Sequence, residues 1–451
     1  MQFLLKASPF FQSIQQNGAS LFFRGQCHNK SWEGILSSLN RGYFPDEIRG
    51  EFAFVWIKGN DWIAAVDHVN QYPLFYSNDF VSPVFSEIIK THSKLTSNPV
   101  AKWELKLLFG FTYGEDTLYK EIKTLPAGHF VKNGIVKRYV DYFHYSGKEN
   151  FDYKEFKNIL DNEILRYATD KNVLLTSGGT DSITLATAIK DLNLQSKFKF
   201  LFLHSPYGLF DERELALDCY KKLGLELIVY ELPFQDFSKA DPAVIERTHS
   251  FWKDRSWLSK SQAIRNLGFE DHTIFTGEVG DQLFGGSKIE SQMLTHLQLP
   301  QLSATDFARQ YINMCLTDHK LNGHGKSAQF LAFHENQETA DIWNQLETKL
   351  AEILELNETS DVGNKFILLH YLTKAPSRIW ASSQDTLKVI HPLASWNVFD
   401  FSMKIPSYMK IGNGGIKKYL FMKAYENSIP VRPFLEPKYN GVMIPIVGVQ
   451  Q

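Results

Sequence analysis

The chain has 451 residues, of which 43% are hydrophobic and 22% charged, and it contains 35 Phe. This composition excludes long disordered regions. The length is sufficient for about two or three domains, each with its own core. Lys plus Arg number 48 and Asp plus Glu number 50, so the formal net charge is -2. Because no basic block stands out either, we do not expect nucleic acid as a partner.

The N-terminal stretch and the cysteines exclude several further classes. MQFLLKASPFFQSIQQNG has Lys6 inside its apolar run and no small-residue cleavage site, and no apolar run approaches the length of a membrane span. We therefore expect a cytoplasmic protein without membrane contact. Cys27, Cys219 and Cys315 are far apart and lack Cys/His ligand spacing, so we expect small buried side chains rather than disulfides or zinc ligands.

Residues 1–145 predict a β-rich first domain. Short segments rich in Phe, Val, Ile and Tyr (SLFFRG, GEFAFVWIKG, DWIAAVDH, YPLFYS and HFVKNGIVKRYV) are separated by Gly, Asn, Asp and Pro. The dipeptide Asn133-Gly134 is a two-residue hairpin signal.

After a polar break at residues 144–153, helical and strand patterns alternate, and we predict a second domain over residues 151–451. Its strands, NVLLTS, KFKFLFLH, LELIVYEL and HTIFTGE, are continuous apolar runs. Such runs are typical of a parallel sheet covered by helices on both faces, so the predicted class is α/β. Helical periodicity dominates residues 300–385 and predicts a helical C-terminal part.

Residues 174–192, LLTSGGTDSITLATAIKDL, join a predicted strand to a predicted helix. The junction consists of small and polar residues: Ser177, Gly178, Gly179, Thr180, Asp181 and Ser182. Unpaired N–H groups at a helix N-terminus favour an anion, glycines permit close approach, and serine hydroxyls can donate to phosphate oxygens. The carboxylate of Asp181 would repel phosphate unless Mg²⁺ bridged the two. The junction therefore predicts a phosphate and Mg²⁺ site, with a plain capped turn as the simpler alternative.

A second strand-to-turn junction, HTIFTGEVGDQLFGG at residues 272–286, carries Glu278 and Asp281. In an open parallel sheet, ligands bind at the carboxyl ends of strands, so the two junctions can face one ligand. We expect Asp181 and Asp281 to hold one Mg²⁺ ion and Glu278 to act as an acid or base nearby. A glycine-rich turn with solvated acids is the alternative.

These two junctions resemble the corresponding loops of a known enzyme family. The first matches the Ser-Gly-Gly-x-Asp-Ser loop of ATP pyrophosphatases, which release pyrophosphate from ATP, and it lacks the lysine of a Walker P-loop. Together they resemble asparagine synthetase, β-lactam synthetase and lasso-peptide cyclase. The resemblance implies an adenine-nucleotide α-hydrolase-like parallel sheet that binds ATP. We expect Leu203, Thr276 and Gly277 to contact the nucleotide as well.

The C-terminal third supplies one further match and one departure. IPVRPFLEPKYNGVMIP resembles the segment in which the family has a catalytic lysine that neutralises charge on the adenylate and pyrophosphate, and this position falls on Lys438. The family commonly has Glu-x-Arg-x-Pro-Phe-Leu-Asp further upstream. The corresponding residues here are Lys388, Ile390, Pro392, Leu393, Ala394 and Ser395, so that only the proline is kept. The acceptor pocket is therefore expected to differ from that of an asparagine synthetase.

Residues 1–145 resemble the glutamine-hydrolysing domain of these enzymes, an Ntn-type αββα sandwich whose nucleophile is an N-terminal cysteine. Gln2 stands at that position, and Cys27 has no free α-amino group to act as its base. We expect this domain to keep its scaffold without glutaminase activity.

The resemblance implies an ATP-dependent ligase that adenylates a carboxylate, releases pyrophosphate and transfers the acyl group to an amine. The nitrogen source would be ammonia, a separate amine or an amine of the same molecule, as in a lactam-forming or lasso-peptide cyclase. Amidation of a sugar acid or another small metabolite fits equally well. The sequence is compatible with a homodimer and with a peptide-processing partner, and it does not decide between them. The alternatives are an ATP pyrophosphatase that modifies RNA or a nucleobase, and a catalytically inactive scaffold.

Overall fold

The structure is a computed structural model, and its elements form two compact units. It describes residues 2–3, 11–44, 48–104, 112–142, 151–205, 212–232, 256–285, 303–321, 337–355, 362–410 and 416–435. The first unit comprises Met1–His144, His249–Lys253 and Gln292–Trp380. The second comprises Tyr145–Thr248, Asp254–Ser291 and Ala381–Gln451.

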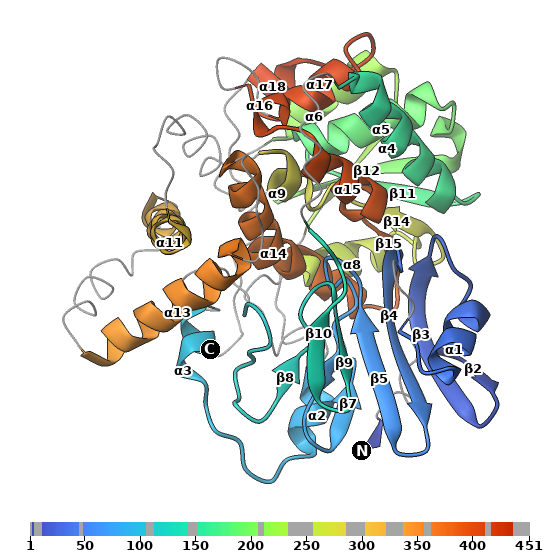
Figure 1. The fold of residues 1–451 in the computed structure, drawn as a ribbon. Helices are drawn as coiled ribbons and strands as arrows, with labels where there is room; N and C mark the ends of the chain where they lie inside the picture. The colour runs from blue at the N-terminus through green and yellow to red at the C-terminus, as the bar shows by residue number, and fades with distance from the viewer. Residues whose placement is uncertain are drawn as a thin grey trace. The chain divides into compact units, whose positions relative to one another are not determined.

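Two sheets form the centre of the first unit (Figure 1). The larger is antiparallel, in the order β10 (Ile135–Arg138), β9 (His129–Lys132), β5 (Asp61–Val66), β4 (Gly50–Lys58), β3 (Ala19–Cys27) and β2 (Gln12–Gln16). The smaller has the order β1 (Gln2–Phe3), β7 (Phe80–Ser82), β6 (Phe75–Tyr76) and β8 (Lys123–Thr124). Asn133 and Gly134 both have positive φ and form the turn between β9 and β10, which confirms the predicted hairpin.

Alternate residues of β4 face opposite layers, as the two-residue period of a strand requires. Phe52 and Phe54 pack with helix α1 (Trp32–Asn40), whereas Val55 packs with Val81 of the smaller sheet. Helix α2 (Phe85–Lys90) covers the smaller sheet through the ring contact of Phe75 and Phe85, with centroids 5.1 Å apart. The layers therefore follow the order helix, sheet, sheet, helix that was predicted for this part of the chain.

Four helices complete the described part of the first unit: α3 (Pro99–Trp103), α11 (Ala304–Leu321), α13 (Gln337–Glu355) and most of α14 (Val362–Ser383). Lys349 of α13 lies 2.8 Å from Glu104 and 2.9 Å from Asp116. Trp380 of α14 donates to the backbone carbonyl of Asn70. The sequence pattern grouped α11, α13 and α14 with the second domain. Periodicity identifies a helix but does not reveal partners that lie more than 200 residues away in sequence.

The second unit is built on a five-stranded parallel sheet, which confirms the predicted α/β class. Its order is β13 (Leu227–Glu231), β12 (Phe198–His204), β11 (Asn172–Thr176), β14 (Thr273–Phe275) and β15 (Lys388–Ile390). Its helices are α4 (Tyr153–Tyr167), α5 (Thr180–Asp191), α6 (Arg213–Leu223), α8 (Ser256–Asn266), α9 (Gly280–Phe284), α15 (Trp396–Lys404), α16 (Ser407–Lys410), α17 (Tyr419–Ala424) and α18 (Arg432–Leu435).

The strand order reverses between β11 and β14. From β11 the chain proceeds outward to β12 and β13, and then returns to the other side of β11 for β14 and β15. The loops that leave β11 and β14 therefore diverge at a topological switch point, where parallel sheets bind their ligands. Both junctions singled out in the sequence lie there.

Candidate functional site

The first loop of the site connects β11 to α5. Gly179 is the N-cap residue of α5 and contributes no side-chain hydrogen bond to the first-turn N–H groups. Gly178 has a φ of 73°, and a Cβ at this position would lie 3.1 Å from Ala216. A glycine is therefore required here both for conformation and for space. The loop has the local structure of an anion-binding helix N-terminus.

The two serines of this loop bond within it. Ser182 Oγ donates to the carbonyl oxygen of Gly179 at 3.0 Å and accepts from the N–H of Ser177 at 3.3 Å. The N–H of Gly179 donates to Ser177 Oγ at 3.3 Å. These bonds fix the shape of the loop. Donation from the hydroxyls to phosphate stays a prediction, and hydroxyl rotation would allow it.

The second loop packs directly on Asp181 through two glycines. A Cβ added to Gly277 would lie 2.8 Å from Cβ of Asp181, and one added to Gly280 would fall on the Asp181 carboxylate. Between them, Val279 is 1% exposed and has a φ of 77°, a conformation that strains a β-branched residue. The two loops are thus in contact, as the sequence predicted for junctions at neighbouring strand ends.

A lysine that the sequence analysis missed lies between the two predicted metal ligands. Lys418 is 1% exposed and forms an ion pair with Asp181 and a second one with Asp281. The distance from Lys418 Nζ to Asp281 Oδ1 is 2.5 Å. Lys418 precedes α17 with a left-handed φ of 52°. In the sequence it is one of two lysines before an apolar segment, a pattern that indicates a solvated charge more often than a buried one. The two carboxylates therefore converge on one cation, which in this structure is the ammonium group of Lys418.

The same two carboxylates fit a magnesium ion whose remaining ligands are water or phosphate oxygens. Within the described ranges, no three His, Cys, Asp or Glu side chains cluster so that they could hold a metal by themselves. Mg²⁺ in nucleotide sites is commonly bound by one or two carboxylates, water and substrate phosphates. The donor set therefore suits a metal that arrives with phosphate, and the assignment of Asp181 and Asp281 as its ligands stays a prediction.

Glu278 lies on the other side of the second loop and pairs with Lys260. The distance from Lys260 Nζ to Glu278 Oε1 is 3.0 Å, and the side chains are 29% and 26% exposed. The N–H of Glu278 donates to Thr276 Oγ1 at 3.3 Å. Glu278 is thus partly accessible and held at the carboxyl end of β14.

His391 supports the same strand end. Its Nδ1 lies 2.7 Å from Thr276 Oγ1 and its Nε2 lies 3.0 Å from Ser382 Oγ. Burial lowers the pKa of His391 to about 4, opposed by the nearby Glu278 and assisted by Lys260. The imidazole is therefore neutral at neutral pH and links β15 to the second loop.

We expect His391 to make the folded chain less stable in mild acid. Its pKa is about 4 in the folded chain and near 6.5 in the unfolded chain, so the unfolded chain binds more protons between these values. The free energy of unfolding should fall by up to about 1.4 kcal/mol per pH unit as the pH drops through this window. Urea unfolding of wild type and His391→Gln at pH 7, 6 and 5 measures this difference. Parallel pH profiles for the two proteins would contradict it.

The remaining predicted residues have different outcomes. Leu203 lies one residue before the end of β12, and its neighbour Phe202 pairs with Thr176 at the end of β11. It is therefore near the first loop in the sheet register, and its contact with nucleotide stays a prediction. Lys438 lies outside the described residues.

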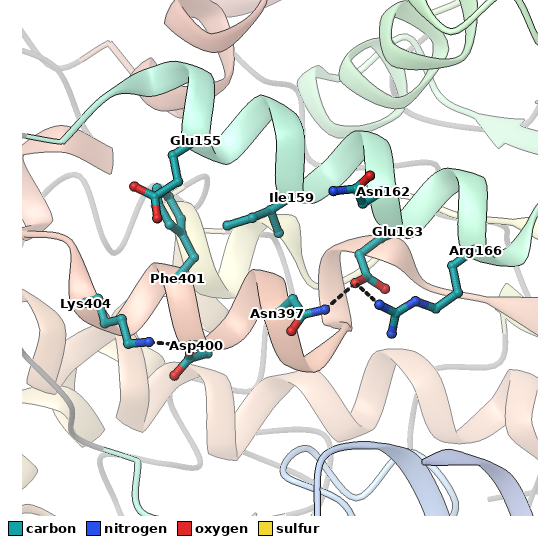
Figure 2. A pocket seen from close by; sticks show the side chains of 9 residues that line it. All are labelled: Glu155, Ile159, Asn162, Glu163, Arg166, Asn397, Asp400, Phe401 and Lys404. Carbon is teal, nitrogen blue, oxygen red and sulfur yellow. Dashed lines mark hydrogen bonds and ion pairs between the residues drawn. The ribbon is translucent and has the colours of Figure 1, made fainter. Parts of the chain in front are cut away.

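A groove of about 440 Å³ lies between α4 and α15 (Figure 2). Most of its polar groups already bind one another: Asn397 donates to Glu163 at 2.7 Å, Arg166 lies 3.6 Å from Glu163, and Lys404 lies 2.5 Å from Asp400. None of the predicted site residues lines it. We therefore place the candidate site at the strand ends and not in this groove.

One comparison with known proteins identifies the family of the chain. A parallel sheet with a phosphate-type loop at its switch point is the architecture of an α/β enzyme that uses a nucleotide. The asparagine synthase family model matches residues 166–441, which is more than half of the chain. The chain therefore belongs to the asparagine synthase family, and it is an ATP-using enzyme of the ligase type.

The chain also matches solved structures at low sequence identity. The NH3-dependent NAD synthetase from Campylobacter jejuni, in complex with a nitrate ion, is 14% identical, with 47% of this chain and 99% of that chain covered and a TM-score of 0.22. The U34-tRNA thiolase NcsA from Methanococcus maripaludis, with its [4Fe-4S] cluster, is 11% identical, with 52% and 83% covered and a TM-score of 0.25. At these scores neither likeness adds to the argument. No curated protein matches the chain.

The helices give no sign of a membrane span. Among the residues that the structure describes, no helix is both long and apolar enough to cross a bilayer.

Proposed function

We propose that this enzyme adenylates a carboxylate with ATP, releases pyrophosphate and transfers the acyl group to an amine to form an amide bond. The observation that carries the proposal is the convergence of Asp181 and Asp281 on one buried cation beside an anion-binding loop. Such an arrangement suits the polyphosphate of ATP, whose charge needs cations on the protein side. Glu278, on the same loop as Asp281, supplies a carboxylate next to this position.

We assign each group of the chain one task. The loop from Ser177 to Ser182 binds phosphate oxygens through its backbone and hydroxyl groups. Asp181 and Asp281 hold Mg²⁺, which when bound neutralises charge on the phosphates. Without the metal, Lys418 neutralises these carboxylates. With Mg²⁺ in place, its proposed partner is a phosphate oxygen of the nucleotide. Lys438 is proposed to be a second such cation.

Glu278 is the proposed general base of the amide-forming step. An attacking ammonium-type substrate must lose a proton before its nitrogen can bond the acyl carbon, and a carboxylate within hydrogen-bond reach accepts it. Because the Glu278 side chain is 26% exposed, a small amine can reach it.

We propose that glutamine is not the source of nitrogen. Cys27, the cysteine of the described glutaminase-like sheet, lies at the end of β3, and burial together with Glu51 and Asp67 raises its pKa well above the usual range of a thiol. A thiol that stays protonated is a poor nucleophile. The amine is therefore ammonia, a separate small molecule or a group of the acid substrate itself.

The proposed setting is the cytoplasm, with a small-molecule or peptide acid as substrate. Neither nucleic acid nor a membrane is proposed as a partner, since the near-neutral net charge of -2 offers no field for either. A second copy of the chain or a peptide-processing protein is compatible with the proposal.

Pyrophosphate exchange into ATP tests the proposed function. The protein is incubated with ATP, Mg²⁺, labelled pyrophosphate and pools of carboxylic acids, with and without glutamine. We expect exchange that depends on an acid and is unaffected by glutamine. Absence of exchange with every pool, together with absence of ATP binding, would favour a scaffold role. Glutamine hydrolysis at the rate of exchange would overturn the assignment of the first unit.

A further inference from the structure

Lys260 of α8 contacts the second loop at Glu278, away from the cluster of Asp181, Asp281 and Lys418. Its Nζ lies 3.0 Å from Glu278 Oε1, and the side chain is 29% exposed. Lys418, in contrast, pairs with Asp181 and Asp281 and is 1% exposed. The site therefore has two cations in different surroundings, one closed off among the predicted metal ligands and one reachable beside the proposed base.

The helix that carries Lys260 is fixed by a buried carboxylate. Asp385, whose side chain is fully buried, accepts hydrogen bonds from Trp257 Nε1 at 2.9 Å and from Ser261 Oγ at 2.5 Å. Arg265 lies 2.6 Å from the other Asp385 oxygen. These three residues of α8 all contact Asp385. Lys260 lies between them in the sequence, and its ammonium group contacts Glu278 instead. The position of the Lys260 ammonium is thus set by a rigid element, as a binding group requires.

The groups around Glu278 leave Lys260 as a cation available to an incoming anion. His391 beside Thr276 is buried and neutral, because burial lowers its pKa to about 4. Thr276, whose Oγ1 accepts a hydrogen bond from the N–H of Glu278 at 3.3 Å, is uncharged as well. A carboxylic acid that enters next to Glu278 meets a like charge, and this repulsion is relieved only if a cation is shared between the two carboxylates.

We propose that Lys260 binds the carboxylate that is adenylated and so determines which acids the enzyme accepts. This inference rests on the proposed function. In the first step a carboxylate oxygen bonds the α-phosphorus of ATP, the bond to the bridging oxygen breaks, and pyrophosphate leaves with the electron pair. The resulting acyl adenylate has lost the carboxylate charge, so Lys260 returns to Glu278. The amine then bonds the acyl carbon, AMP leaves with its electron pair, and the amine proton passes to Glu278.

The uncharged surroundings also indicate the class of acid. Thr276 and His391, which lie next to Glu278, provide no charge that could pair with a second ionic group close to the carboxylate. The preferred substrate is therefore a carboxylic acid that is uncharged next to its carboxyl group, rather than an α-amino acid.

The test compares wild type, Lys260→Met and Lys260→Arg by pyrophosphate exchange with acetate, 3-phenylpropionate, glucuronate, aspartate and a hexapeptide with a free C-terminus. For the acid that wild type uses best, we expect Lys260→Met to raise KM at least tenfold while KM for MgATP changes less than twofold. Lys260→Arg should recover most of the affinity. Lys197→Met, which removes a surface ion pair with Asp170 of 2.9 Å, is the matched control and should behave as wild type.

Three results would overturn the proposal. The first is an unchanged KM for the acid in Lys260→Met. The second is normal pyrophosphate exchange in Lys260→Met combined with slow transfer of the acyl group to hydroxylamine, the defect expected of Glu278→Gln. That result would limit Lys260 to positioning the base. The third is preferential use of aspartate, which would refute the class of acid. If wild type exchanges pyrophosphate with no acid at all, the proposed function itself fails and this inference fails with it.

Discussion

Replacing Asp181 with Asn should lower acid-dependent pyrophosphate exchange by about 10²- to 10³-fold, the usual effect of removing one group that stabilises transferring charge. Asn has the size of Asp and lacks its charge, so it ligates Mg²⁺ poorly and no longer helps to bring the metal to the phosphates. Exchange is measured at saturating acid, and MgATP affinity is followed separately by calorimetry.

The Asp181→Asn substitution should leave the fold intact, because Lys418 keeps its second partner, Asp281. The contacts of Gly277 and Gly280 with this side chain do not depend on charge. Asp191→Asn at the other end of α5 is the matched control: Asp191 lies 3.5 Å from Lys157 on the surface and should be dispensable for exchange. Equal exchange by Asp181→Asn and wild type would remove Asp181 from the proposed metal site.

Replacing Lys418 with Met should destabilise the second unit strongly in the presence of EDTA. Removing one member of a buried ion pair costs about 3–5 kcal/mol, and the partial exposure of Asp181 (15%) and Asp281 (28%) reduces this to about 2–4 kcal/mol. The reason is that two carboxylates would then face each other without a cation. Thermal unfolding should show a midpoint lower by roughly 5–10 °C.

Millimolar Mg²⁺ should restore much of the lost stability in Lys418→Met and change wild type little, because the ion and the ammonium compete for the same carboxylates. Lys423→Met is the control: Lys423 is on α17, the helix that Lys418 precedes, and its ion pair with Glu426 at 3.2 Å is exposed. A Mg²⁺ effect of equal size in wild type and Lys418→Met would contradict competition at this position.

The sequence predicted those features that have a local pattern. The hairpin at Asn133-Gly134, the continuous apolar strands of the parallel sheet and the two loops were all recognisable, because turn residues, strand periodicity and loop glycines act on their immediate neighbours. Because β11 and β14 are neighbours in the sheet, the two loops that carry Asp181 and Asp281 begin at adjacent strand ends.

The parts that escaped prediction depend on partners far apart in sequence. Lys418 is 237 residues from Asp181, and as single residues Lys260 and Lys418 are indistinguishable from surface lysines. The grouping of α11, α13 and α14 with the first unit has the same cause, since the contact of Lys349 with Glu104 spans 245 residues. A charge pattern identifies an ion pair only when its partners are one helical turn apart.

The strained backbone of Val279 has a consequence for how this region folds and opens. A buried valine at a φ of 77° is maintained only while its surroundings over-determine it, and here these surroundings are two glycines pressed against Asp181 of the other loop. Neither loop can hold its shape once the other has left. The two loops should therefore exchange their amide hydrogens in concert, as one cooperative unit whose opening dismantles the proposed phosphate loop and both proposed metal ligands at once.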